Sequence, residues 1–185
     1  MPDDLPTLST DQQENLIKPV SKHEIFKAMS SMANGKSPRP NGLNVEFLKY
    51  FWHTIGDSIT QSIQHFFNIG HMPSSWNRTH ICLIPKKKNP KTVTDFRPIS
   101  LCNTNYKIIT KIMSNRLKQI LPDIIGIEQT AFVQGRSIFD NILMAQELVH
   151  SLEKNTKDHL MMILKIDMEK AYDVVCWNSI YAMLM

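Results

Sequence analysis

Apolar residues between Asn44 and Gly70 recur at the spacing of an amphipathic helix. They lie three or four positions apart, at Val45, Leu48, Phe51, Trp52, Ile55, Ile59, Ile63 and Phe66. This period predicts one helix with a single apolar face. Gly56 falls inside the run, and a glycine there lets the helix kink or split at that point.

Residues 1–20 form a polar lead-in before this pattern. Ser21 and Glu24 have the spacing of a capping box, so we expect a short helix from there to about Met32. The sequence KSPRPNG, residues 36–42, is typical of a proline-rich loop. The predicted organisation is therefore a lead-in, residues 1–20, and one folded region, residues 21–185.

The second half of the chain mixes strand and helix patterns. HICLIP, residues 80–85, predicts a short buried strand, and a basic turn connects it to an extended ISL segment, residues 99–101. Apolar spacing predicts a helix over 106–122 and another from Ser137 onward. The apolar run 160–166 has the length of a buried strand. This order of elements predicts an α+β fold that is mostly helical.

The net charge of +4 is unevenly distributed. Between Arg78 and Lys118 there are ten Lys or Arg and one acid, Asp95, which gives +9. The other residues carry eleven basic and sixteen acidic side chains, which gives −5. A basic block inside a folded region suggests a surface for phosphates or nucleic acid, although a solvated face with ordinary helix lysines explains the same charges.

Composition argues against several classes of protein. No run of 18 uncharged apolar residues occurs, so we expect no transmembrane helix and no membrane partner. The acidic N-terminus is not a secretory signal, which favours a nuclear or cytoplasmic protein. Cys82, Cys102 and Cys176 form no C-x-x-C pair, which fits a reducing compartment and argues against a disulfide scaffold or a zinc finger.

Asp167 follows the apolar run 160–166 directly. A carboxylate at the exit of a buried strand is a common ligand for a cation such as Mg²⁺, which proteins hold with few carboxylates plus substrate phosphates. Alternatively, Asp167 caps a helix that starts near Met168. Asp173 fits a helix surface better than a second metal ligand.

Two basic stretches are candidates for phosphate binding. In IPKKKNPKTVTDFRPISL, residues 84–101, lysines on a turn and Arg97 before a proline would suit a triphosphate. The alternative is a solvated hairpin in which Arg97 pairs with Asp95. In EQTAFVQGRSIFDNI, residues 128–142, Gly135 and Arg136 precede a helix start and could meet a phosphate, or form a simple capped turn.

Four stretches in this order resemble the reverse transcriptase domain of non-LTR (LINE-type) retrotransposons, particularly the plant type. KSPRPNGL is similar to K-[AS]-P-G-P-D-G, and residues 84–117 are similar to the fingers segment I-P-K…R-P-I-S-L…Y-K. Residues 128–142 resemble Q-x-x-F-x-x-G-R-x-x-x-D-N-I. LKIDMEKAYDVVCW resembles the first catalytic palm motif, K-x-D-x-x-K-A-[FY]-D-R-[VI]-x-W. Group II intron maturases are the alternative, but the first stretch and SLCNTNYK favour the LINE type.

The resemblance implies a partial right-hand polymerase fold, with the fingers and the first palm strand. Asp167 would be the first catalytic aspartate and would bind Mg²⁺. Lys86 and Arg97 would lie near the incoming deoxynucleoside triphosphate, and Tyr172 would lie under its sugar.

Further implications concern the nucleic acid. Gln134, Gly135 and Arg136 would help to position the template and the nucleotide. The basic block would become a fingers surface against an RNA template and a DNA primer.

The sequence departs from the family at several positions. Arg39 replaces a glycine and would strain its turn by roughly 1 kcal/mol if φ is positive there. Asn41 replaces an aspartate and Val174 an arginine; we interpret all three as drift in a copy no longer under selection.

The family's second aspartate pair, in a [FY]-A-D-D hairpin, does not occur in the sequence. We therefore expect a domain truncated at both ends, and no polymerase activity from these residues alone. The alternatives are a residual non-catalytic RNA- or DNA-binding module, and a product that does not fold stably because the 160–166 strand has unpaired edges.

Overall fold

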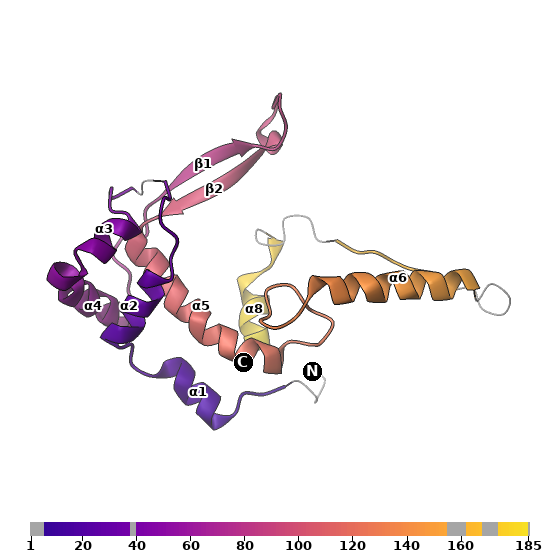
Figure 1. Ribbon diagram of the computed structural model, residues 1–185, viewed down its shortest axis with the longest axis horizontal. Coiled ribbons are helices and arrows are strands. Elements are labelled where there is room, and N and C mark those ends of the chain that lie inside the picture. The colour runs from indigo at the N-terminus through magenta and orange to yellow at the C-terminus, as the bar shows by residue number, and fades with distance from the viewer. Residues whose placement is uncertain (1–5, 38–39, 155–161, 168–173, 185) are drawn as a thin grey trace. The chain divides into compact units, whose positions relative to one another are not determined.

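The computed structural model of the chain describes residues 6–37, 40–154, 162–167 and 174–184 (Figure 1). These residues form two compact units, 1–136 and 137–185. The elements are α1 (Thr10–Ile17), α2 (Lys22–Ser30), α3 (Val45–Tyr50), α4 (Trp52–Ile69), β1 (Thr79–Pro85), η1 (Val93–Asp95), β2 (Phe96–Cys102), α5 (Thr104–Ile124), α6 (Ile138–Lys154) and α8 (Trp177–Leu184). The mixture of helix and strand, mostly helical, agrees with the prediction. None of the helices described is long and apolar enough to cross a membrane.

The segment predicted as a polar lead-in contains a helix, α1. Ser9 and Gln12 form a capping box: the Ser9 hydroxyl accepts from the Gln12 amide, and the Gln12 side chain accepts from the Ser9 amide. None of the residues of α1 is buried, which explains why the helix lacks an apolar pattern in the sequence. Val20, just after it, is buried in the core.

Helix α2 begins where the sequence predicts. The Ser21 hydroxyl accepts a hydrogen bond from the Glu24 amide at 3.1 Å. In a full capping box, the Glu24 carboxylate would also accept a hydrogen bond from the Ser21 amide. Here the Glu24 carboxylate binds Arg116 instead.

The predicted helix over 44–70 is split, but not at Gly56. Asn44 caps α3 by accepting from the Phe47 amide at 2.7 Å, and the break lies at Phe51, where φ is −93° and ψ is 14°. Gly56 is buried inside α4, and a Cβ there would lie 2.9 Å from Cε2 of Trp52. The glycine therefore makes room for the Trp52 ring instead of breaking the helix.

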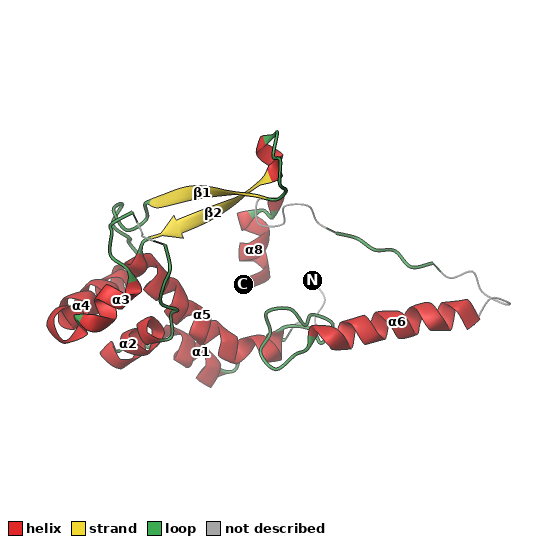
Figure 2. Cartoon of the chain, turned by 45° about the horizontal axis from the view of Figure 1, so that its top comes forward, coloured by secondary structure: helices red, strands yellow, loops and turns green. Residues whose placement is uncertain are grey.

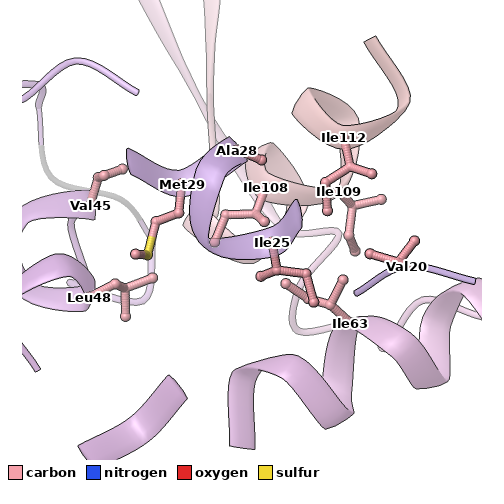
Figure 3. Close-up of a cluster of buried hydrophobic side chains, with 10 residues drawn as sticks. All are labelled: Val20, Ile25, Ala28, Met29, Val45, Leu48, Ile63, Ile108, Ile109 and Ile112. Carbon is pink, nitrogen blue, oxygen red and sulfur yellow. The ribbon is translucent and has the colours of Figure 1, made fainter. Parts of the chain in front are cut away.

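The hydrophobic core of the first unit lies between α2, α3, α4 and α5. Its buried members are Val20, Ile25, Ala28, Met29, Val45, Leu48, Ile63, Ile108, Ile109 and Ile112 (Figure 3). Helix α2 is central: Figure 3 shows Met29 directed toward Leu48 of α3 and Ile25 toward Ile63 of α4. Burying such side chains stabilises the fold by about 25 cal/mol of free energy for each Å² of apolar surface removed from water. This packing fixes α2 against α5.

Strands β1 and β2 form an antiparallel hairpin with Thr79 opposite Cys102 and Pro85 opposite Phe96. Both strands occur where the sequence predicts. The predicted burial of β1 is wrong, because all its residues are exposed. Figures 1 and 2 show the ribbon extending away from the helices of its unit, which agrees with the exposure of every β1 residue.

The second unit contains α6 and α8. The start of α6 is confirmed: the Ser137 hydroxyl accepts from the Phe139 amide at 3.2 Å. The predicted strand over 160–166 is wrong for its described part, since 162–167 is irregular and exposed. A strand needs a paired backbone, and the two strands in the described residues pair only with each other.

Candidate nucleic-acid interface

The packing of α2 against α5 creates two open grooves with basic walls. The first has a volume of about 630 Å³ and the second about 480 Å³, and Ser31 and Lys111 line both. We call this continuous surface the basic groove. Its cationic side chains are Lys18, Lys27, Lys36, Lys107, Lys111, Arg116 and Lys118.

Glu24 is the acidic residue that lines the basic groove, and Arg116 neutralises it. Two guanidinium nitrogens of Arg116 donate to the two carboxylate oxygens, each at 2.8 Å. This hydrogen bonding, opposed by partial burial and helped by the Arg116 and Lys18 charges, holds the pKa of Glu24 below its usual value. The lysines therefore dominate the field of the groove, which favours a polyanion.

The structure brings Lys86 and Arg97 to the same face of the hairpin. Arg97 lies opposite Ile84, and the Lys86 amide donates to the Asp95 carbonyl at 2.7 Å, so Lys86 and Arg97 occupy diagonal positions. Both side chains are exposed. The Lys86 ammonium donates to the Thr94 carbonyl at 2.9 Å.

The alternative in which Asp95 pairs with Arg97 is wrong. Asp95 instead accepts from the Lys87 ammonium at 2.8 Å and from the Lys91 and Thr92 amides at 2.8 and 3.0 Å. The Lys87 hydrogen bond, followed by the two amides, lowers the pKa of Asp95 to about 2. Asp95 thereby orders the basic tip, and Arg97 makes no ion pair among the described residues.

Arg136 holds the loop between α5 and α6 together. Its guanidinium donates to four backbone carbonyls: those of Pro122 at 3.0 Å, Ile125 and Gln129 at 2.8 Å each, and Gly126. Two of these carbonyls belong to the last turn of α5 and to its C-cap, where a cation is favoured. Arg136 thus has a structural role, and its predicted contact with template or nucleotide stays a prediction.

The two residues before Arg136 differ in position and role. Gly135 has a φ of 83°, which a glycine adopts without strain. Gln134 is exposed and lines the basic groove. The structure therefore joins this predicted block to the surface formed by α2 and α5.

Asp167 lies on the irregular segment 162–167 and is exposed. The described residues contain no group of three or more His, Cys, Asp or Glu side chains that could hold a metal ion. One exposed carboxylate does not make a Mg²⁺ site, so the described residues do not fit the two-metal centre of a polymerase. Tyr172 and Asp173 lie outside the described residues.

A buried polar cluster holds the proline-rich loop, and it was not predicted. The Asn103 side chain is buried and accepts from the Asn41 amide at 3.2 Å. Its amide nitrogen donates to the carbonyls of Ser75, Trp76 and Arg78 at 2.8 to 3.3 Å. The side chain of Asn41 accepts from the Leu43 amide, a bond that an aspartate would also make. Arg39 lies outside the described residues.

Three lysines of the basic groove, Lys18, Lys27 and Lys36, lie outside the basic block of the sequence. Lys27 lies near Lys111 and Lys118 because α2 packs on α5, and Lys18 and Lys36 flank α2 in the sequence. Counting charges along the sequence therefore does not identify Lys18, Lys27 and Lys36 as part of this surface. The available signal was the helical spacing of the polar residues His23, Lys27 and Ser31, which indicates one solvent face of α2.

The comparisons with known proteins find similar sequences over most of the chain. The reverse transcriptase (RNA-dependent DNA polymerase) family matches residues 84–184. The transposon TX1 uncharacterized 149 kDa protein of Xenopus laevis is 36% identical over 94% of the chain. The probable RNA-directed DNA polymerase from transposon BS of Drosophila melanogaster is 27% identical over 95%. The Pol polyprotein of retrotransposable element R2 of Popillia japonica is 22% identical over 88%.

The match over more than half of the chain defines its class. The chain belongs to the reverse transcriptase family, of the non-LTR retrotransposon type, which confirms the resemblance of its four sequence blocks. It spans 13%, 19% and 22% of the length of the three relatives. What those proteins do as a whole is therefore a proposal for this chain.

Proposed function

We propose that these 185 residues are the nucleic-acid-binding fingers part of a right-hand reverse transcriptase, with the segment that carries its first catalytic aspartate. The observation that supports this best is the basic groove, which is lined by seven cationic side chains and by one acid, Glu24, that pairs with one of them, Arg116. Such a surface binds the phosphate backbone of RNA or DNA and releases counterions, so its affinity falls with salt. In the whole polymerase its partners are an RNA template and a DNA primer.

The hairpin supplies the second part of the proposal. Lys86 and Arg97 share one face of an exposed ribbon, a placement that suits contact with the phosphates of an incoming deoxynucleoside triphosphate. Tyr172 is proposed to contact the sugar of that nucleotide, and Gln134, Gly135 and Arg136 to position template and nucleotide.

Catalysis is proposed to need more than these residues. Asp167 is the family's first Mg²⁺ ligand by its motif, and in a polymerase two such ions would activate the primer 3′-hydroxyl and stabilise the pyrophosphate. The sequence lacks the [FY]-A-D-D pattern that supplies the other carboxylates. We expect no primer extension by the chain with Mg²⁺ and nucleotides, and Asp167→Ala should leave RNA binding unchanged. Extension that Asp167→Ala abolishes would overturn this part.

Fluorescence anisotropy with labelled RNA tests binding and separates the two basic surfaces. One variant removes Lys27, Lys111 and Lys118 of the basic groove, and a matched variant removes Lys86, Lys88 and Arg97 of the hairpin, all as alanine. If the groove binds the backbone, the first variant loses more affinity and has the shallower dependence on salt between about 50 and 200 mM. Wild-type binding that is absent, or insensitive to salt, would refute the proposal.

A further inference from the structure

Phe132 combines two costly features. Among the described residues, Phe132 is the only non-glycine residue with a positive φ, 65°, and the residue is 88% exposed. A left-handed backbone is unfavourable for a residue with a Cβ. An aromatic ring that stays in water also contributes almost no favourable free energy of burial to folding. Burial of this ring therefore contributes little to the stability of its unit. Strain of this kind is concentrated at ligand-binding sites.

The loop that carries Phe132 is well anchored. Thr130 and Val133, on either side of it, are buried. Arg136 fixes the same loop through four backbone carbonyls between residues 122 and 129. The exposed ring is therefore presented by an ordered loop, as a preorganised binding element requires.

The surroundings of Phe132 indicate what it could bind. The ring lines an apolar hollow on α5 together with Met113, Leu117 and Leu121. Lys118 lines both this hollow and the basic groove. Since Lys111 and Lys118 are seven positions apart on one helix, they lie on the same face, two turns from each other. An aromatic ring thus lies beside a row of positive charges.

We propose that Phe132 is a stacking platform for a base of single-stranded nucleic acid whose phosphates lie along Lys111 and Lys118. This rests on the proposed nucleic-acid binding, and it adds that the bound strand is single and that Phe132 contacts one of its bases. A ring next to a basic track is the arrangement of single-strand binding proteins, because unpaired bases offer their π-faces while a duplex hides them. Charge complementarity favours this ligand over a protein segment in the apolar hollow.

Binding of the full chain to labelled single-stranded RNA, and to a duplex of the same length, tests the proposal. Phe132→Ala should weaken single-strand binding about fivefold or more and duplex binding less than about twofold. Phe132→Trp should stay close to wild type and show quenched tryptophan fluorescence on binding. The matched control is Tyr50→Ala, which removes another exposed aromatic ring that lines neither groove.

Phe132→Gly separates binding from folding. Glycine accepts the positive φ, so this variant should melt no lower than Phe132→Ala, yet bind the single strand as weakly. The salt slope should be unchanged in every Phe132 variant, because the ring carries no charge. Unchanged single-strand affinity in Phe132→Ala, or an equal loss with the duplex, would overturn the inference while leaving the proposed function intact. Absence of any wild-type binding would refute both.

Discussion

Arg116 of α5 and Glu24 of α2, which lie 92 positions apart in the sequence, form a two-pronged ion pair. Nε and Nη2 of Arg116 donate to Oε1 and Oε2 of Glu24, each at 2.8 Å. The remaining nitrogen, Nη1, donates to the carbonyls of Leu16 and Lys18, also at 2.8 Å. One buried arginine therefore connects α5 to α2 and to the end of α1, and so sets the walls of the basic groove.

Substituting Arg116 should destabilise the protein strongly. Arg116→Ala leaves a half-buried carboxylate and two carbonyls without their donor, which costs about 3 kcal/mol of the free energy of unfolding. Arg116→Lys keeps the charge but cannot reproduce the planar fork, so it should recover only part of the loss. Urea unfolding followed by circular dichroism measures both. Lys22→Ala, which breaks the exposed ion pair of Lys22 with Asp57, is the control and should cost less than about 1 kcal/mol. Equal stability of all three variants would contradict this role.

The same ion pair predicts how stability changes with acid. Hydrogen bonding to Arg116 is the main reason that the pKa of Glu24 lies below its usual value of 4.5. A carboxyl group whose pKa is lower in the folded state stabilises it fully above the unfolded value, and the contribution is lost as pH falls through the folded pKa. The difference in unfolding free energy between wild type and Glu24→Gln should thus be present at pH 7 and shrink below about pH 4.5. A difference that stays constant down to the lowest pH would show that the charge is irrelevant.

The number of phosphates that the lysines of the basic groove neutralise can be measured from the salt dependence of binding. If Lys111 and Lys118 each neutralise one phosphate of single-stranded RNA, each alanine variant should reduce the slope of log affinity against log salt by about 0.7. Lys22→Ala removes the same charge from α2, but Lys22 is paired with Asp57 and lines neither groove, so the slope should not change. Anisotropy titrations at four or more salt concentrations give the slopes. Equal effects of all three substitutions would indicate a response to net charge instead of contact.

Much of the fold could be predicted where a local signal determines the structure. The start of α2 at Ser21, the two strands of the hairpin and the start of α6 at Ser137 follow from caps, turns and periodicity, which act within a few residues. The predictions that were wrong concern features that depend on residues far away in the sequence. Whether β1 is buried, or whether 162–166 pairs as a strand, is decided by what packs or pairs with it, and a single sequence does not contain that information.

The candidate site divides in the same way. Their motif singles out Lys86 and Arg97, and the hairpin register places them on one face, while their contact with a triphosphate stays a prediction. The basic groove could not be predicted from charge along the chain, because Lys27 meets Lys111 only through the core between α2 and α5. Phe132 belongs to the block that resembles Q-x-x-F-x-x-G-R, but its positive φ could not be predicted, since this backbone conformation contradicts the intrinsic preference of a phenylalanine.

Arg136 allows a structural role to be separated from a role in binding. Its four carbonyl contacts need the width of a guanidinium, so Arg136→Lys should lower the melting temperature and speed amide exchange over residues 122–136. The lysine keeps the positive charge, so the salt slope of RNA binding should not change in either Arg136→Lys or Arg136→Ala if the guanidinium contacts only backbone. Hydrogen exchange read by mass spectrometry and the anisotropy titration provide the two measurements. A slope that falls by about 0.7 in Arg136→Ala but not in Arg136→Lys would instead show that this side chain leaves its carbonyls to bind a phosphate.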